Sequence, residues 1–221
     1  MKLRPGRALL AIGTLLLLSG ANFAQTSVPK VAAEVDEHYN HLRTLQANFT
    51  EIYRGNGISR QESGTLCLKR PGKMRWNYLQ PKEKFFISDG KAAWFYVPGE
   101  QQARRTSVKK LEDLRSPLGY LLGKTKLRKE FEGLSLAPDV KPVHPGDVVL
   151  RGVPKFMQSV TQVEMEIAPG GKIVKLAVEG ADGSTTEYLF EEQKENLELA
   201  DRQFQFTPPP GVQVIEEEAG Q

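Results

Sequence analysis

The sequence contains few of the residues from which disulfide frameworks and metal clusters are built. Its 221 residues include one cysteine, Cys67, and three histidines. A single thiol excludes a disulfide framework and any multi-cysteine zinc or iron–sulfur site, and three histidines leave little material for a histidine-based metal site. We therefore expect no bound metal, and we interpret Cys67 as a small buried hydrophobe.

Net charge is also scarce in the body of the chain. The sequence has 30 Lys and Arg against 27 Asp and Glu, which gives a formal net charge of +3. Lys2, Arg4 and Arg7 supply three of those positive charges, so the remainder has 27 basic and 27 acidic residues. Nucleic-acid-binding proteins normally have a basic excess, and we therefore expect no nucleic-acid partner.

The motifs of common catalytic sites are missing. The sequence has no G-x-S-x-G elbow, no phosphate-binding P-loop, no H-E-x-x-H pair and no dinucleotide-binding fingerprint. His38 and His41 are three residues apart, a spacing that can place both on one helix face. No third ligand accompanies them, so we interpret them as surface histidines. We predict that the protein is not an enzyme and that it uses no cofactor.

One strongly apolar run lies near the N-terminus. Residues 8–18 read ALLAIGTLLLL, follow the three leading positive charges and precede the small residues Ser19-Gly20-Ala21. This order is typical of a secretory signal peptide, and the run is shorter than the roughly 20 residues that a membrane-spanning helix needs. We predict a signal peptide over 1–24, cleaved after Ala21 or Ala24, and one exported domain over 25–221. An uncleaved membrane anchor is the alternative.

The rest of the chain predicts one helix followed by many strands. Residues 30–45 have the apolar spacing of an amphipathic helix, beginning beside Pro29. Apolar residues then recur at every second position in 64–70 and 73–78, as in half-buried strands. The same alternation recurs in Trp94/Tyr96, Val163/Met165/Ile167, Val174/Leu176/Val178, Tyr188/Phe190 and Phe204/Phe206.

Turn signals and a helical insert complete the predicted architecture. The strand-like runs are separated by pairs that favour tight turns, namely Asn56-Gly57, Pro71-Gly72, Asp89-Gly90, Pro98-Gly99, Gly170-Gly171 and Asp182-Gly183. Residues 109–114 and 117–122 resemble two short helices, and 126–131 adds another helical turn. About ten strands in this arrangement indicate a large antiparallel sheet, strongly curved or barrel-like. A large curved sheet covered by only a few helices can enclose an apolar cavity. An ordinary packed core is the alternative.

Arg70 departs from the alternating pattern. It follows Leu66 and Leu68 on their face of the predicted strand, where a guanidinium is costly unless its donors find acceptors. Helix ends leave backbone carbonyls unpaired, so the helices around 117–122 would offer suitable acceptors. Alternatively, the strand ends at Lys69 and Arg70 faces water.

Two sequence blocks carry a family resemblance. Residues 64–71 read GTLCLKRP, and residues 88–96 read SDGKAAWFY. They resemble the G-x-L-x-x-K-R-P and S-D-G-K-x-x-W-x-Y segments of the outer-membrane lipoprotein carrier protein (LolA) family. Other segments in the same order also resemble that family, namely Gln46-Ala47-Asn48-Phe49-Thr50, Met74-Arg75-Trp76, Ser116-Pro117-Leu118 and residues 204–212.

The resemblance implies a fold and a function. The fold would be mainly β with α, an incomplete antiparallel β-barrel of about ten or eleven strands covered by an N-terminal helix and a short helical lid, enclosing an apolar cavity. The function would be that of a monomeric periplasmic chaperone. It would carry acylated lipoproteins from an inner-membrane ABC transporter of the LolCDE type to an outer-membrane receptor of the LolB type. Relatives with this fold carry other lipids, such as a glycolipid or hopanoid, or sense lipoproteins, and these functions remain alternatives.

The resemblance also implies roles for particular residues. Arg70 matches the arginine of the family's K-R-P segment, which is taken to hold the lid by hydrogen bonds, so we expect it to be the lid latch. No catalytic residue is expected. The residues expected to line the cavity and lid are Phe49, Leu66, Leu68, Met74, Trp76, Trp94, Tyr96, Leu118, Tyr120, Leu121 and Leu122.

Overall fold

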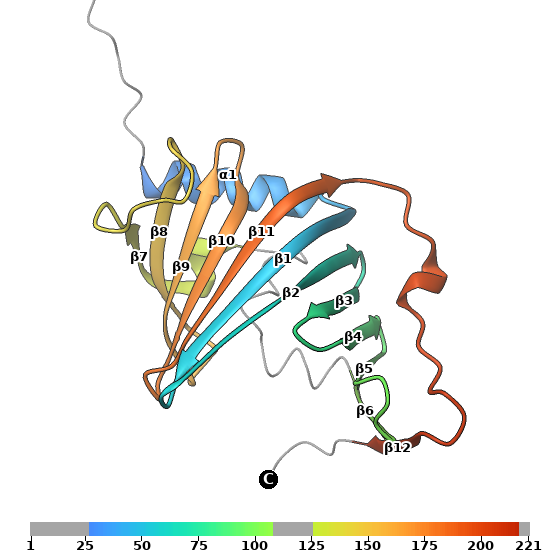
Figure 1. Cartoon of the computed structure of the whole chain (residues 1–221). Coiled ribbons are helices and arrows are strands. Elements are labelled where there is room, and N and C mark those ends of the chain that lie inside the picture. Colours follow the sequence, from blue (N-terminus) through green and yellow to red (C-terminus); the bar gives the residue numbers. More distant parts are fainter. Residues whose placement is uncertain (1–26, 108–125, 217–221) are drawn as a thin grey trace, which may run out of the picture.

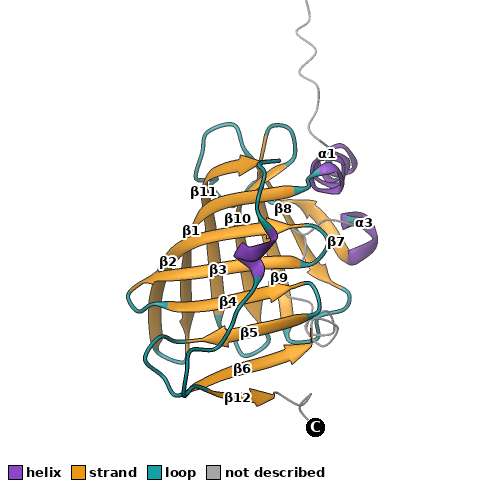
Figure 2. Cartoon of the chain, turned by 90° about the vertical axis from the view of Figure 1, so that its right-hand side faces the viewer, coloured by secondary structure: helices purple, strands orange, loops and turns teal. Residues whose placement is uncertain are grey.

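One strongly curved sheet dominates the fold. The structure, a computed structural model, describes residues 27–107 and 126–216. Within these ranges twelve strands form a single sheet in the order β12-β6-β5-β4-β3-β2-β1-β11-β10-β9-β8-β7. Figures 1 and 2 show that the sheet curls round its concave face and that α1 lies across one end of it. The predicted mainly β, curved-sheet fold is confirmed, with slightly more strands than expected.

The strands and helices have the following bounds. They are α1 (Val28–His41), β1 (Thr44–Gly55), β2 (Ile58–Lys69), β3 (Lys73–Gln80), β4 (Lys84–Asp89), β5 (Ala92–Tyr96), β6 (Gln102–Ser107), α3 (Leu127–Glu130), β7 (Phe131–Leu136), β8 (Val148–Pro154), β9 (Val160–Ala168), β10 (Lys172–Gly180), β11 (Thr185–Glu195), the 3-10 helix η2 (Asp201–Phe204) and β12 (Gln213–Glu216). The helical turn predicted in 126–131 corresponds to α3. The predicted signal peptide and the predicted helices in 109–122 lie outside the described residues.

Tight turns join most neighbouring strands, as the sequence predicts. The two residues between β1 and β2, Asn56 and Gly57, have φ values of 51° and 74°. Two successive positive φ angles are the requirement of a type I′ hairpin, which Asn-Gly satisfies well. The β1–β2 register runs without a shift from Gly55↔Ile58 to Thr44↔Lys69. The turn chemistry therefore fixes which side chains of β1 and β2 share the concave face.

Helix α1 ends earlier than its apolar pattern predicts. The helix begins at Val28, so Pro29 lies in its first turn rather than just before it. At the other end the chain becomes extended at Leu42, and Leu45 belongs to β1 rather than to the helix. Leu45 pairs with Leu68 on one side and with Glu195 on the other, so two strand ladders override the local helical pattern. The helix buries Val31, Ala32, Val35 and Tyr39. No helix among the described residues is long and apolar enough to cross a membrane.

The two histidines of α1 have different surroundings. His41 is exposed and lies 3.2 Å from the Glu37 carboxylate, one turn earlier on the helix. The side chain of His38 is only 15% exposed, and its Nε2 lies 3.3 Å from Oε1 of Glu195 on β11. The interpretation of His38 as a surface histidine was therefore wrong, because the helix places it against the end of the sheet.

After β11 the chain crosses the outer, convex face of the sheet (Figure 2). This segment, residues 196–212, is called the strap below. It contains η2 and leads to β12, which pairs with β6 in parallel. The alternation of Phe204 and Phe206 predicted a strand, which was wrong: Phe204 ends η2, and Phe206 packs on Trp94 and Tyr96. Both rings cover the outer face rather than extending the sheet.

Candidate functional site

The centre of the concave face is a cluster of aromatic rings. Phe49 of β1 contacts Trp76 and Tyr78 of β3 edge to face, with ring centroids 4.7 and 4.9 Å apart. Tyr188 and Phe190 of β11 lie 6.1 and 6.4 Å from Trp76. Phe49 and Trp76 are 1% and 3% exposed. Such pairs gain about 0.5–1.5 kcal/mol beyond the area they bury, and none of them requires a directed hydrogen bond.

A glycine lets these rings meet across an intervening strand. In the register, Gly64 of β2 stands between Phe49 of β1 and Tyr78 of β3. An added Cβ at Gly64 would lie 1.8 Å from the backbone oxygen of Asn77, far inside any allowed contact. The glycine that opens the G-x-L segment is therefore required by the close approach of β3. It also leaves no side chain between the Phe49 and Tyr78 rings.

Helix α1 covers the concave face at one end of the strands. Its buried side chains Val31, Val35 and Tyr39 join the same core cluster as Phe49, Trp76 and Phe190. The backbone N–H of Ile173 donates to the Tyr39 hydroxyl at 3.0 Å. At Gly171, in the β9–β10 turn, an added Cβ would lie 2.2 Å from the Glu34 backbone oxygen. Helix and hairpin are therefore in direct backbone contact here.

Arg70 connects the end of β2 to this helix. Its guanidinium donates to the backbone oxygen of Asn40 at 2.9 Å and also to that of Tyr39. These carbonyls belong to the last turn of α1, where intrahelical partners run out and a cation is favoured by the helix dipole. Burial lowers the pKa of Arg70 below its usual range. An arginine remains charged after such a shift.

The position of Arg70 differs from both expectations formed from the sequence. The strand does end at Lys69, yet the guanidinium binds helix carbonyls instead of simply facing water. Those carbonyls belong to α1, whereas the sequence pointed to helices around 117–122, which lie outside the described residues. The missed acceptors are explained by the predicted helix boundary, because a helix running to Leu45 would not end beside Arg70.

The opposite end of the concave face carries ionisable groups that sequence reasoning missed. Glu51 and Glu62 face each other across β1 and β2, and both are buried, at 8% and 7% exposed. The Tyr78 hydroxyl donates to Glu51 at 2.8 Å. The Lys84 ammonium lies 2.8 Å from Glu62, and Nε of Arg60 lies 3.1 Å from it. The signal was present, since Glu51 follows Phe49 by two residues and therefore shares its face.

Burial dominates the electrostatics of this polar end. It raises the pKa of Glu51, an effect that the Tyr78 hydrogen bond partly opposes. Burial and the neighbouring Glu51 carboxylate likewise raise the pKa values of Tyr78 and Tyr188. Glu62 forms ion pairs with Lys84 and Arg60, and Glu51 accepts a hydrogen bond from Tyr78. The concave face therefore has one apolar end and one hydrogen-bonded polar end.

The predicted lining residues fall into three groups. Phe49, Leu66, Leu68, Met74 and Trp76 lie on the concave face, in or against its core cluster. Trp94 and Tyr96 lie on the outer face, where both pack on Phe206, so their placement with Trp76 was wrong. Their neighbour Phe95 pairs with Phe86, which pairs with Trp76 on the concave side. Leu118, Tyr120, Leu121 and Leu122 lie outside the described residues.

The comparisons with known proteins decide the family. Residues 40–207 match the family described as "Outer membrane lipoprotein carrier protein LolA". The chain belongs to the LolA family. It is similar to the outer-membrane lipoprotein carrier protein of Nitrosomonas europaea, with 30% identity over 80% of this chain and 84% of that protein. It is also 30% identical to the carrier protein of Dechloromonas aromatica, over 91% of this chain and 96% of that one.

The structural comparison finds a solved structure with a similar fold. An uncharacterized conserved protein from Thermus thermophilus has a TM-score of 0.53 at 15% identity, with 87% of this chain and 100% of that chain covered. At this identity the likeness concerns the fold alone. The LolA-family match spans the region from the last turn of α1 to the strap, and it therefore includes Arg70, the concave aromatic cluster and the polar end.

Proposed function

We propose that this protein is a periplasmic carrier that takes acylated lipoproteins from the inner membrane to the outer membrane. Membership of the LolA family supports this function, and so do the carrier names of relatives that match along most of the chain. The structural observation that carries the proposal is the concave face, with its cluster of Phe49, Trp76 and Phe190 beneath α1. A predicted N-terminal signal peptide supplies the route of export.

The concave face would bind acyl chains without directed bonds. The aromatic and aliphatic contacts are non-directional, so an acyl chain can replace them without leaving polar groups unpaired. Each buried methylene contributes about 0.8 kcal/mol, so complete burial of a long chain would bind too tightly for a shuttle. The proposal therefore requires incomplete burial, or a closed empty state that competes with the cargo.

Release of cargo from spheroplasts tests the proposal. Purified mature protein, incubated with inner-membrane spheroplasts, should release an acylated lipoprotein as a soluble complex. Failure to release any lipoprotein would contradict the function. Mass spectrometry of ligand that co-purifies from the periplasm identifies the cargo, and recovery of a glycolipid or hopanoid in place of lipoprotein would reject the lipoprotein assignment.

Two neighbouring phenylalanines of β4 provide a matched pair of variants. Phe86 packs against the concave core cluster, whereas Phe85 pairs with Tyr96 on the outer face and lies beneath Arg75. Both rings are half-buried. Phe86→Glu should reduce lipoprotein release at least about tenfold, because an unpaired carboxylate against apolar surface costs more than 1.4 kcal/mol. Phe85→Glu, beside a guanidinium, should release lipoprotein normally, and equal loss in both variants would reject the concave face as the binding surface.

Arg70 is proposed as the latch of the closed empty state. Its two hydrogen bonds to the last turn of α1 join the end of β2 to the helix that covers the concave face. If cargo entry requires these bonds to break, Arg70→Leu should load lipoprotein as well as the natural protein or better. Delivery to a LolB-type receptor should fall, because return to the closed state no longer helps to expel the acyl chains.

Loading and delivery must be measured separately in this experiment. Arg70→Lys should restore delivery only in part, since an ammonium lacks the planar fork that reaches two carbonyls. Circular dichroism checks that Arg70→Leu is folded, because loss of charged hydrogen bonds costs about 1.5–3 kcal/mol each. Normal delivery by folded Arg70→Leu, or its failure to load, would show that the latch proposal is wrong. The partners of the LolCDE and LolB types are part of the same proposal.

A further inference from the structure

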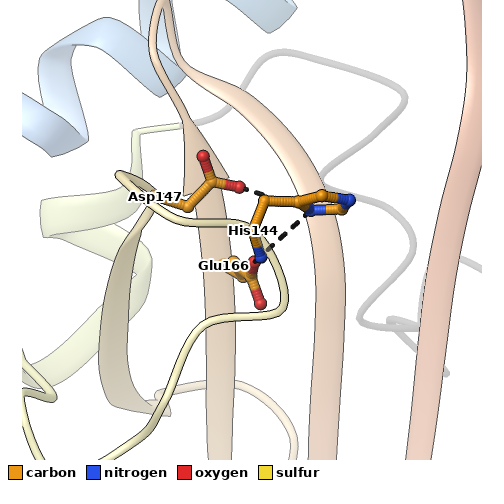
Figure 3. Close-up of side chains that lie close together, drawn as sticks. All are labelled: His144, Asp147 and Glu166. Atoms are coloured by element: carbon orange, nitrogen blue, oxygen red, sulfur yellow. Dashed lines mark hydrogen bonds and ion pairs between the residues drawn. The ribbon is translucent and has the colours of Figure 1, made fainter.

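A second cluster of ionisable side chains lies outside the concave face. His144 is in the loop between β7 and β8, Asp147 directly precedes β8, and Glu166 is in β9. Glu166 stands between Met165 and Ile167, whose side chains belong to the concave core, so its own side chain is on the outer face. Figure 3 shows the three side chains lying close together, with His144 linked to both carboxylates.

The geometry brings three potential ligand atoms together. Nδ1 of His144 lies 3.7 Å from Oδ2 of Asp147 and 3.7 Å from Oε1 of Glu166, and all three atoms lie within 4.8 Å of one another. Gly146, at φ 94°, provides the turn between His144 and Asp147. The backbone N–H of His144 donates to Oε1 of Glu166 at 3.0 Å and holds the loop over β9.

Both carboxylates are buried, and one oxygen lacks a hydrogen bond. The side chains of Asp147 and Glu166 are 6% and 3% exposed. Oδ2 of Asp147 is among the few buried side-chain atoms of the described residues that have no hydrogen-bond partner. A buried unsatisfied carboxylate oxygen is costly. Burial, and then the adjacent Glu166 carboxylate, raises the pKa of Asp147, which reflects the same cost.

The nearby cations do not satisfy this pair of carboxylates. Lys175 is paired with Glu166 in the strand register, but its ammonium binds Glu187 at 2.7 Å. The His144 ring is 3.7 Å from each carboxylate, beyond the 2.7–3.2 Å of an N–H···O hydrogen bond. A small divalent cation between the three atoms would contact all of them at once.

We propose that His144, Asp147 and Glu166 form a binding site for a divalent transition-metal ion, with Zn²⁺ as the preferred ion. One imidazole and two carboxylates are ligands that Zn²⁺ accepts in tetrahedral sites, with bonds of about 2.0–2.2 Å. Such bonds place ligand atoms about 3.4 Å apart, so the two 3.7 Å edges need to shorten by a few tenths of an ångström, and the third edge, which is within 4.8 Å, needs to close to the same length. His144, whose side chain is 56% exposed, is on a loop that can supply this movement. Water would take the fourth position on the open side.

The bound ion would attach the β7–β8 loop to β9 on the outer face. It would neutralise the two buried carboxylates and give Oδ2 of Asp147 a partner. The site takes no part in lipoprotein binding as proposed above, since it is separated from the concave face by the sheet itself. Zinc binding should therefore raise the thermal midpoint of unfolding without being needed for lipoprotein release.

Isothermal titration of tag-free, chelator-treated mature protein with ZnCl₂ tests the site. The natural protein should bind one Zn²⁺ saturably, and Mg²⁺ at equal concentration should bind much more weakly because imidazole is a poor ligand for it. His144→Ala and Asp147→Asn should weaken binding by at least the roughly 10- to 100-fold that loss of an outer-shell partner costs known sites. Glu166→Gln should do the same.

A second histidine–carboxylate pair serves as the matched control. His41 lies 3.2 Å from Glu37 on α1. His41→Ala should bind Zn²⁺ within about twofold of the natural protein, because one histidine and one carboxylate offer only two ligands, whereas a zinc site has three or four. His144 is exposed, so His144→Ala is expected to stay folded and decides the test even if Glu166→Gln does not fold. The proposal is overturned if the natural protein shows no saturable binding, if His144→Ala binds as tightly, or if Mg²⁺ competes equally.

Discussion

Different kinds of interaction stabilise the packing on the two faces of the sheet. On the concave face, Phe49, Trp76 and Phe190 pack through ring contacts and apolar area. On the outer face, directed polar bonds hold the strap. Arg75 donates to the Gln203 backbone oxygen at 3.0 Å, and Lys69 donates to that of Leu199 at 2.6 Å. Non-directional contacts can be exchanged for other apolar groups, whereas directed bonds cannot, so the apolar end of the concave face is the adaptable part.

The polar bonds of the strap begin where β11 ends. The Thr44 hydroxyl donates to the Leu197 backbone oxygen at 2.7 Å, and the Asn196 side-chain oxygen accepts from the Arg43 N–H at 2.9 Å. Further along, Asp201 lies 2.6 Å from the ammonium groups of both Lys69 and Lys73. The strap thus fixes one end of β1, β2 and β3 from outside, while the inner side chains at that end, Leu45, Leu68 and Met74, pack in or against the apolar core.

The largest expected effect comes from removing a ring on the concave face. Phe49→Ala should lower the free energy of unfolding by about 3–5 kcal/mol, the usual range for a fully buried phenylalanine. Phe206→Ala, which removes a half-buried ring of the strap, should cost about 1 kcal/mol. Denaturant unfolding of both variants measures the difference. Equal losses would mean that the strap contributes as much apolar stabilisation as the concave core.

The effect of Glu51→Gln, a substitution at the polar end of the concave face, on the free energy of unfolding should depend on pH. Because burial raises the pKa of Glu51, its carboxyl holds a proton more tightly in the folded than in the unfolded chain. Its contribution to stability therefore falls as the pH rises from the ordinary glutamate pKa through the folded one. Glu51→Gln cannot titrate and can still accept the Tyr78 hydrogen bond. The stability of the variant relative to the natural protein should increase as the pH rises above the ordinary glutamate pKa of about 4.3.

Unfolding experiments across this pH range measure that relative stability. Ser63→Ala in β2 serves as a nearby control that changes no titratable group. The measured quantity is the free energy of unfolding of Glu51→Gln minus that of the natural protein. If this quantity decreases with rising pH, burial is not the dominant cause of the pKa shift.

The smallest effect is expected for one ion pair of the strap. Lys69 and Lys73 lower the pKa of the exposed Asp201 to about 2. The pairing therefore stabilises the fold above the unfolded pKa of the aspartate and is lost as the pH falls through about 2. At neutral pH, Asp201→Asn should leave global unfolding nearly unchanged, as is usual for exposed pairs. It should instead make trypsin cleave faster at Arg202, the next residue on the strap.

The control for this variant is Glu198→Gln, an exposed change on the same strap. Salt at high concentration screens exposed ion pairs, so it should reduce the difference between Asp201→Asn and the natural protein. Identical cleavage rates at low salt would show that the two lysines do not hold the strap.

The sequence predicted the curved sheet because its local signals agree with one another. Asn56-Gly57 sets the β1–β2 register, and the alternation through Leu66, Leu68 and Trp76 then gives the concave face. Prediction failed in β5, where Ala93, Trp94, Phe95 and Tyr96 are apolar on both faces of the strand. Alternation of apolar and polar residues therefore does not show which of them face the concave side. Only the long-range contact with Phe206 places Trp94 and Tyr96 on the outside.

Other features depend on tertiary contacts that sequence spacing does not encode. The end of α1 is set by the pairing of Leu45 with two strands, and that end supplies the carbonyls that Arg70 binds. His144 and Glu166 are 22 residues apart and meet only because a loop folds back over β9. No local motif marks such a pair, and the only histidine spacing considered in the sequence, that of His38 and His41, was interpreted as two surface histidines.

The parallel pairing of β12 with β6 has a consequence for association between molecules. An uncovered β6 would present a row of free backbone groups, the kind of edge on which strands of other chains add and aggregates begin. The strap brings Gln213–Glu216 onto that edge, in register with Gln102–Arg105, and Arg105 binds Glu216 at 2.7 Å. The described part of this new edge carries the charged side chain of Glu216, which discourages further strand addition. By covering Gln102–Arg105, β12 therefore keeps the backbone groups of this part of β6 from pairing with strands of other chains.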